Sequence, residues 1–313
     1  MRGASPHTTR VWGTLRYSKN MEDTKKVPLV GTIWNVAFNT LKNNPVILLV
    51  FALSGILKLI CLLVIFLSIF YPLSIVFGPI IKTLWGGMFL HYPFNFSLMP
   101  KLFYYSQITV YIFIDSLLSG TAIWMAFQAN EGKKPKLLEA LKKVLSKYVT
   151  LAGFLLAIFL VVWLVYYGEK LLIFKLAKLK FMASLIKTGM LDFALVFVNF
   201  FIIILVEMIF SFAMPFAVLE DKRFFKAVWA SLTLAKKLFL STFILIFIPT
   251  LVTLPFSLLK TGLSALMDKT IPEITLLVLG LSVIVTVFID CIVTVSLTLL
   301  FLLKKDLQIE KAK

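Results

Sequence analysis

The sequence predicts an all-α, polytopic integral membrane protein with six transmembrane helices, arranged as three parallel two-span repeats with interfacial amphipathic helices. Three observations support this prediction. Hydrophobic residues make up 60% of the 313 residues, which is well above the roughly one half that is usual for soluble domains. Six apolar segments are each long enough to cross a bilayer. A basic, amphipathic segment precedes every second one of them.

The first 20 residues are basic and contain no acid, and no apolar core of a secretory signal follows them. We expect residues 1–28 to form a disordered basic tail. Two alternatives stay open: a transit peptide, which shares this composition, and a true start at Met21.

Six apolar segments follow the tail, and each approaches or exceeds the roughly 20 residues that a helix needs to span the hydrocarbon core. Since lipid offers no hydrogen-bond partners to an open backbone, each should be helical. Prolines inside two of them predict kinks in the fourth and fifth helices, at Pro215, Pro249 and Pro255. The segments are approximately 46–70, 104–129, 149–167, 191–217, 238–259 and 274–303.

The distribution of Lys and Arg predicts the orientation of these spans. Of the 32 basic residues, 22 lie in the two terminal segments and in the loops 130–148 and 218–237, whereas 9 lie on the other side. The positive-inside rule then places both termini in the cytoplasm. We expect the partners to be membrane lipids, with anionic headgroups at the cytoplasmic face, and residues 304–313 to be a charged cytoplasmic tail.

Amphipathic segments precede the first, third and fifth spans: "GTIWNVAFNTLKNN", "PKLLEALKKVLSKY" and "DKRFFKAVWASLTLAKK". We expect each to form a helix at the membrane surface, although each is alternatively the end of a longer transmembrane helix. In the third, Asp221 is a candidate N-cap, and the expected apolar stripe is Phe224, Phe225, Val228, Leu232 and Ala235. One domain over 29–303 is thus predicted, with repeat units of about 29–129, 134–217 and 221–303.

The returning helix of each unit carries one acid: Asp115, Glu207 and Asp290. Their distances in sequence from the cytoplasmic ends of the spans put all three about 20 Å deep, at 1.5 Å per residue. Lys58, in the first span, lies at the same depth. Because a charge in hydrocarbon is costly, the four residues are predicted to form one intramembrane polar cluster.

Two roles are open for this cluster. The acids form a proton or cation site, or a polar pocket for a lipid headgroup; alternatively, they hold the three repeats in register, which we favour. Lys58 can neutralise one acid, and the sequence does not say which. Candidate hydrogen-bonding neighbours are Ser116, Asn199, Ser211, Thr286 and Thr294.

Other chemistry finds no support in the sequence. Cys61 and Cys291 lie in apolar runs, His7 and His91 have no ligand-spaced partner, and no phosphate-binding loop or hydrolase motif is present. We therefore predict no catalytic residues, no cofactor, no metal and no nucleic-acid partner.

The stretch "SFAMPFAVLEDKRFFKAVWASLTLAKKLFLSTFILIFI" resembles the six-helix membrane domain associated with bacterial glycerophosphoryl diester phosphodiesterases and related uncharacterised prokaryotic membrane proteins. The stretch "AFNTLKNNPVILLV" resembles the entry into their first span. The resemblance implies a six-helix inner-membrane protein but no phosphodiesterase activity, because that chemistry belongs to a soluble domain. The residues that carry it are Pro215, Glu220, Asp221, Ala227, Ser231, Leu232, Lys236 and Lys237.

These observations favour a non-enzymatic membrane protein that transports or organises lipids or another amphipathic molecule. The alternatives are a membrane-embedded lipid-modifying enzyme and a structural subunit of a membrane complex.

Overall fold

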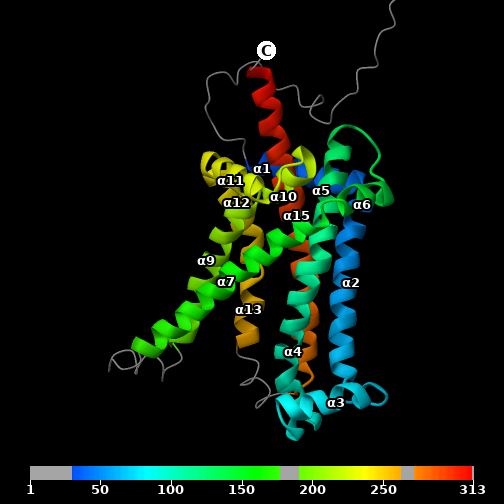
Figure 1. Ribbon diagram of the computed structural model, residues 1–313, viewed down its shortest axis with the longest axis vertical. Coiled ribbons are helices and arrows are strands. Elements are labelled where there is room, and N and C mark those ends of the chain that lie inside the picture. The colour runs from blue at the N-terminus through cyan, green and yellow to red at the C-terminus, as the bar shows by residue number, and fades with distance from the viewer. Residues whose placement is uncertain (1–29, 177–189, 262–270, 312–313) are drawn as a thin grey trace, which may run out of the picture.

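The computed structural model describes residues 30–176, 190–261 and 271–311. Every regular element within these ranges is a helix, which confirms the predicted all-α class. Figure 1 shows long helices running in broadly one direction, with short helices gathered at both ends. The tail predicted over residues 1–28 lies outside the described residues.

Five helical runs are long and apolar enough to cross a membrane, and a sixth candidate is the helix pair Phe224–Lys237 and Phe239–Leu251, which is bent by 95°. Their apolar residues extend onto the outer surface, where Leu49, Val161 and Ile284 are exposed, as lipid-facing side chains must be. A multi-pass membrane protein is therefore supported. The runs consist of α2 (Val46–Leu67), α4 (Phe94–Val110) with η4 (Tyr111–Asp115) and α5 (Ser116–Asn130), α7 (Tyr148–Leu176), α9 (Met190–Phe210) with α10 (Ala213–Glu220), and α15 (Ile274–Lys311).

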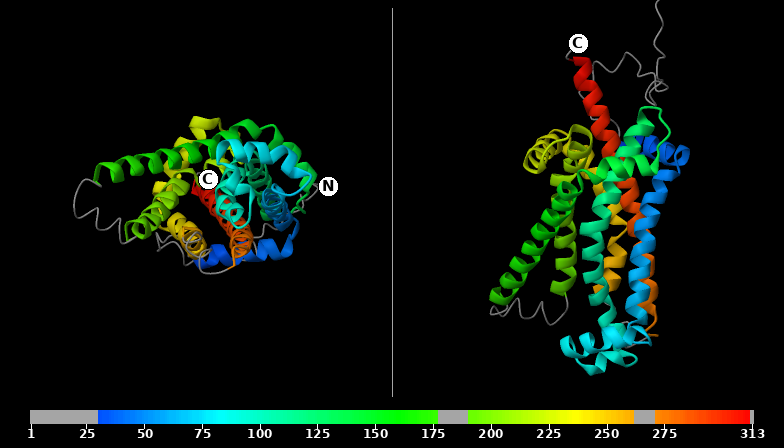
Figure 2. Two further views of the ribbon diagram at one scale, coloured as in Figure 1. Left: turned by 90° about the horizontal axis from the view of Figure 1, so that it is seen from below. Right: turned by 45° about the vertical axis from the view of Figure 1, so that its right-hand side comes forward.

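All three amphipathic segments form helices, as predicted, and each is followed within a few residues by a long helix. Each has lysine in its last turn. Figures 1 and 2 show all three at the end of the molecule where α15 terminates, whereas α3 (Leu73–Leu84) and η3 (Gly87–Leu90) lie at the opposite end. The three are α1 (Val30–Asn43) before α2, α6 (Leu137–Leu145) before α7, and α11 (Phe224–Lys237) before α12 (Phe239–Leu251).

The face that α11 buries overlaps with the predicted stripe. Ala235 is buried, and Phe224 and Val228 pack against the core, where the ring of Phe224 stacks on Phe154 at 4.9 Å. Phe225, also in the stripe, is 84% exposed, and large aromatic side chains are stable at a membrane surface. The buried face also includes Ala227, Ser231 and Leu234, and its small residues let two helices approach closely.

Proline breaks the fourth and fifth spans, in agreement with the predicted kinks at two of three sites. A proline ring clashes with the carbonyl group four residues earlier. Accordingly, α9 and α10 are separated at Ser211, four residues before Pro215, and α12 ends at Leu251, four residues before Pro255. The segment predicted as the fifth span continues in α13 (Leu254–Thr261), and α12 runs through Pro249 without ending there.

Asp221 does not cap α11, contrary to the prediction. It follows the last residue of α10 with φ of 54°, a left-handed conformation that ends the helix. Its carboxylate forms an ion pair with Lys147, just before α7, and the hydrogen bond from Lys147 lowers the pKa of Asp221. The residue thus connects the end of α10 to the start of α7.

Helix α15 continues beyond its apolar part, so the segment predicted as a charged tail, 304–313, is helical as far as Lys311. One predicted boundary was wrong. The second span begins at Phe94 rather than near residue 104, since its first turns are polar and aromatic instead of aliphatic.

Helix α15 occupies the centre of the bundle, with contacts to α1, α2, α4, α5, α12 and α13. Helices α7 and α9 pack against each other and diverge from the other spans toward the end that holds α3 (Figure 2).

Candidate functional site

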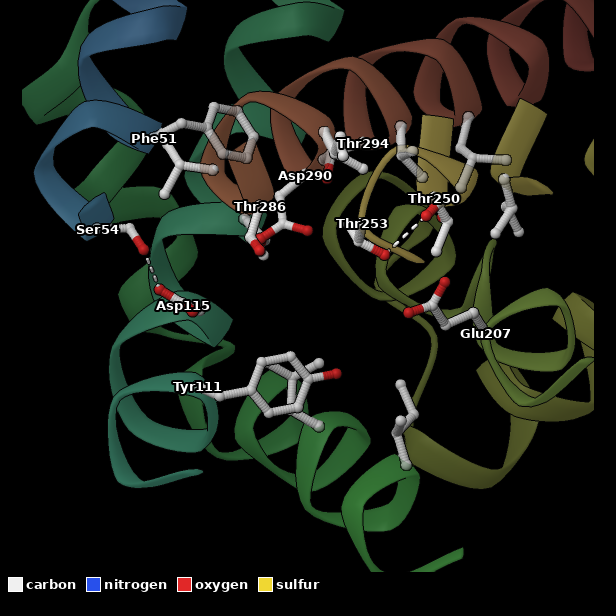
Figure 3. Close-up of a pocket in the computed structure, with 18 of the residues that line it drawn as sticks. Phe51, Ser54, Tyr111, Asp115, Glu207, Thr250, Thr253, Thr286, Asp290 and Thr294 are labelled. Carbon is white, nitrogen blue, oxygen red and sulfur yellow. Dashed lines mark hydrogen bonds between the residues drawn. The ribbon is translucent and has the colours of Figure 1, made fainter. Parts of the chain in front are cut away.

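A cavity of about 380 Å³ lies within the helix bundle. Side chains from α2, η4, α5, α7, α9, α10, α12, α13 and α15 line it, so residues from all three predicted units meet there. Figure 3 shows Asp115, Asp290 and Glu207 arranged around it, with Asp115 and Glu207 on opposite sides. The cavity therefore contains the three acids singled out from the sequence.

Lys58 pairs with Asp115. The Lys58 Nζ atom lies 2.7 Å from Asp115 Oδ2, and their side chains are only 6% and 11% exposed. Ser54 Oγ donates a hydrogen bond of 2.5 Å to the other carboxylate oxygen. Both oxygens of Asp115 thus have a partner, which is what keeps a buried ion pair tolerable away from water.

Local helix geometry explains why these three residues meet. Ser54 and Lys58 are four residues apart and so share one face of α2. Asp115 ends η4, a π-helical turn over Tyr111–Asp115 that interrupts the second span. Such turns widen the helix locally and are frequent at functional sites. Here Tyr111 and Asp115 both line the cavity.

Glu207 and Asp290 have no such partner. Among the described residues, neither carboxyl group makes a hydrogen bond or an ion pair, and both line the cavity. Asp290 is exposed, but it is the cavity that makes its surface accessible (Figure 3). Asp290 lies within electrostatic range of Lys58 and Asp115, and Glu207 within range of Asp290. The four predicted residues thus form one electrostatic group, with a single direct contact.

Of the predicted neighbours, Ser211, Thr286 and Thr294 line the cavity. Two predictions were wrong. Asn199 donates a 3.0 Å hydrogen bond to Glu169 of α7, and Ser116 bonds the backbone carbonyl of Phe113. Both side chains point away because rotation about each helix axis, unlike depth, does not follow from counting residues.

Sequence reasoning missed Ser54 and Tyr111. A usable signal was present, because each precedes a predicted charged residue by four positions and therefore shares its helix face. It also missed a polar row on α15, in which every fourth residue is polar. The row spans about 24 Å at 1.5 Å per residue, and all its members line the cavity: Ser282, Thr286, Asp290, Thr294 and Thr298.

The broken fifth span supplies hydroxyl groups on the facing side. Thr253, at the break, donates a 2.7 Å hydrogen bond to the carbonyl group of Thr250, and Ser257 donates one of 3.2 Å to that of Thr253. These bonds satisfy carbonyl groups near the break between α12 and α13. Lys260, near the end of α13, lines the cavity and is exposed.

No group of three or more His, Cys, Asp or Glu residues with a geometry able to hold a metal ion occurs within the described ranges. The acids surround an open space and do not converge on a point. This arrangement suits a molecule of many atoms better than a bare ion.

Comparison with protein-family models, with curated proteins and with solved structures gives no match. The resemblance to the phosphodiesterase-associated membrane domain stays a prediction.

Proposed function

We propose that this chain is a non-enzymatic membrane protein that carries an amphipathic molecule, such as a lipid, between the two membrane surfaces. The intramembrane cavity is the observation that carries the proposal. Its volume of about 380 Å³ falls within the range of pockets that hold small molecules. Its wall combines apolar side chains with acids and hydroxyl groups, as a molecule with both a polar and an apolar part requires.

The polar row on α15 supports movement as well as binding. Its length of about 24 Å covers most of a hydrocarbon core roughly 30 Å thick. A polar group moving along this row keeps hydrogen-bonding partners, while an apolar part can remain among the aliphatic side chains. The helices α7 and α9, which both contribute to the lining, diverge from the other spans toward the end that holds α3 (Figure 2).

We further propose that six spans form three parallel units in a prokaryotic inner membrane, with both termini cytoplasmic and α12 with α13 as the fifth span. The position of α1, α6 and α11 at one end of the molecule supports this arrangement (Figure 1). Each of these helices carries lysine in its last turn, which suits contact with anionic lipid headgroups.

Cysteine labelling tests the topology. With Cys61 and Cys291 replaced by Ala, we expect cysteines at the exposed positions Leu138 and Phe225 to react with an impermeant maleimide only from the cytoplasmic side. Cysteines at Met88 and Ile271, which are also exposed, should react only from the other side. Labelling of both pairs from one side would exclude the proposed topology.

Lipid translocation tests the function. Vesicles containing the purified protein and a fluorescent phospholipid are treated with dithionite, which quenches only the outer leaflet. We expect more complete quenching with the protein than without it. Thr286→Trp should abolish the gain by filling the cavity, whereas Ile284→Trp, on the lipid-facing side of the same helix, should not.

Equal quenching with and without the protein, or an unaffected Thr286→Trp variant, would contradict carriage through the cavity. Chemical turnover of the phospholipid that is lost in Asp115→Asn would point instead to a lipid-modifying enzyme.

A further inference from the structure

The charges at the cavity are unevenly balanced. Asp115 is neutralised by Lys58 at 2.7 Å. Glu207 and Asp290 have no ion-pair partner among the described residues, and they lie within range of each other's charge. The lining contains Lys260, which is exposed near the end of α13. An anionic group would meet two acids here, whereas a cationic group would supply their missing counter-charge.

The hydroxyl groups of the lining reinforce this preference. Ser282 and Thr286 donate their protons to backbone carbonyls of α15 at 2.7 and 2.8 Å. Thr253 does the same at 2.7 Å to Thr250, and Ser211 at 2.9 Å to Met208. A hydroxyl group has one proton to donate. What these four side chains present to the cavity is therefore oxygen lone pairs, which attract positive charge.

The rest of the wall is apolar and partly aromatic. Phe154, Phe210 and Tyr111 contribute to the lining, and aromatic faces attract organic cations. A bare metal ion fits poorly, because the acids do not group at ligand distance within the described residues.

We infer that the cavity binds a lipophilic organic cation, with its positive group between Glu207 and Asp290 and its apolar part against the aromatic side chains. The inference rests on the proposed carrier function and names the substrate class for the same site. The cation is either a free molecule or the ammonium group of a lipid headgroup, since both present the same chemistry to the two acids.

A pair of probes with nearly the same shape and opposite charge tests the inference. Purified full-length protein in a neutral detergent is dialysed to equilibrium against tetraphenylphosphonium or tetraphenylborate, with protein-free micelles as the blank. We expect saturable binding of the phosphonium and none of the borate. Glu207→Gln and Asp290→Asn, which preserve side-chain shape, should each weaken phosphonium binding about tenfold, as loss of a charged contact implies.

Glu169→Gln provides the matched control, because Glu169 is also an acid on a spanning helix but bonds Asn199 away from the cavity. Its affinity for the phosphonium should equal that of the unmodified chain. Equal binding of both probes, or phosphonium binding that Glu207→Gln and Asp290→Asn leave unchanged, would overturn the inference.

Competition by lipids identifies the source of the cation. Displacement of the phosphonium by phosphatidylcholine but not by phosphatidylglycerol supports a lipid headgroup, and no displacement by either supports a free cation. Displacement by both to the same extent would contradict a charge-selective site.

This test is independent of the translocation assay. Cation binding without translocation would contradict the carrier function and keep the substrate class. Translocation without cation binding would contradict the substrate class and keep the carrier function.

Discussion

Replacing Lys58 by Met should destabilise the folded protein by about 3–5 kcal/mol, the usual cost of leaving one partner of a buried ion pair uncompensated. The Lys58 side chain is 6% exposed and that of Asp115 is 11% exposed, so water cannot readily replace the lost contact. The hydrogen bond from Ser54 would remain but supplies no charge. Unfolding in detergent, followed by circular dichroism over a denaturant series, measures the loss.

A second substitution tests whether Asp115 is the partner. Lys58→Met combined with Asp115→Asn removes both charges and should recover much of the stability, because no isolated ion remains. Lys58→Met combined with Asp290→Asn is the matched control and should recover little. If the two substitutions in the first pair change the free energy of unfolding additively, within about 0.5 kcal/mol, the pair is not coupled as the structure indicates.

The membrane explains why much of the fold follows from the sequence. Because each span must satisfy its own backbone in lipid, a long apolar run predicts both a helix and its approximate ends. Depth follows from counting residues, and it placed Lys58, Asp115, Glu207 and Asp290 at one level. The structure brings the three acids to one cavity and pairs Lys58 with Asp115 beside it.

Rotation about each helix axis does not follow from the sequence in the same way. The π-helical turn that ends at Asp115 changes which residues of the second span face inward, and no apolar pattern marks it. Helix rotation decides that Lys58 pairs with Asp115, and it also decides that Asn199 bonds Glu169 instead of facing the cavity. The exposure of Phe225 on α11 has a related cause, since hydrophobicity alone does not distinguish the protein from the lipid side of a helix.

At the break in the fourth span, Ser231 of α11 forms hydrogen bonds with backbone groups that lose their helical partners. Pro215 prevents continuous helix through Ser211, so nearby backbone groups lose their helical partners. The Phe212 N–H donates to Ser231 Oγ at 3.1 Å, and Ser231 Oγ donates to the Ile209 carbonyl at 2.7 Å. One hydroxyl group from α11 thus satisfies a donor and an acceptor on α9 and the break that follows it.

Ser231→Ala should therefore cost about 2–4 kcal/mol, because it leaves two backbone groups unpaired in a site with no exposure to solvent. Thr233→Val is the matched control: Thr233 lies on the same helix and bonds the carbonyl of Trp229, but it is exposed, and its loss should cost less than about 0.5 kcal/mol. Denaturant unfolding in detergent compares the two variants. Equal stability of the Ser231→Ala and Thr233→Val variants would mean that Ser231 does not support the break. The packing of Ala227 and its neighbours alone would then hold the α9–α10 corner.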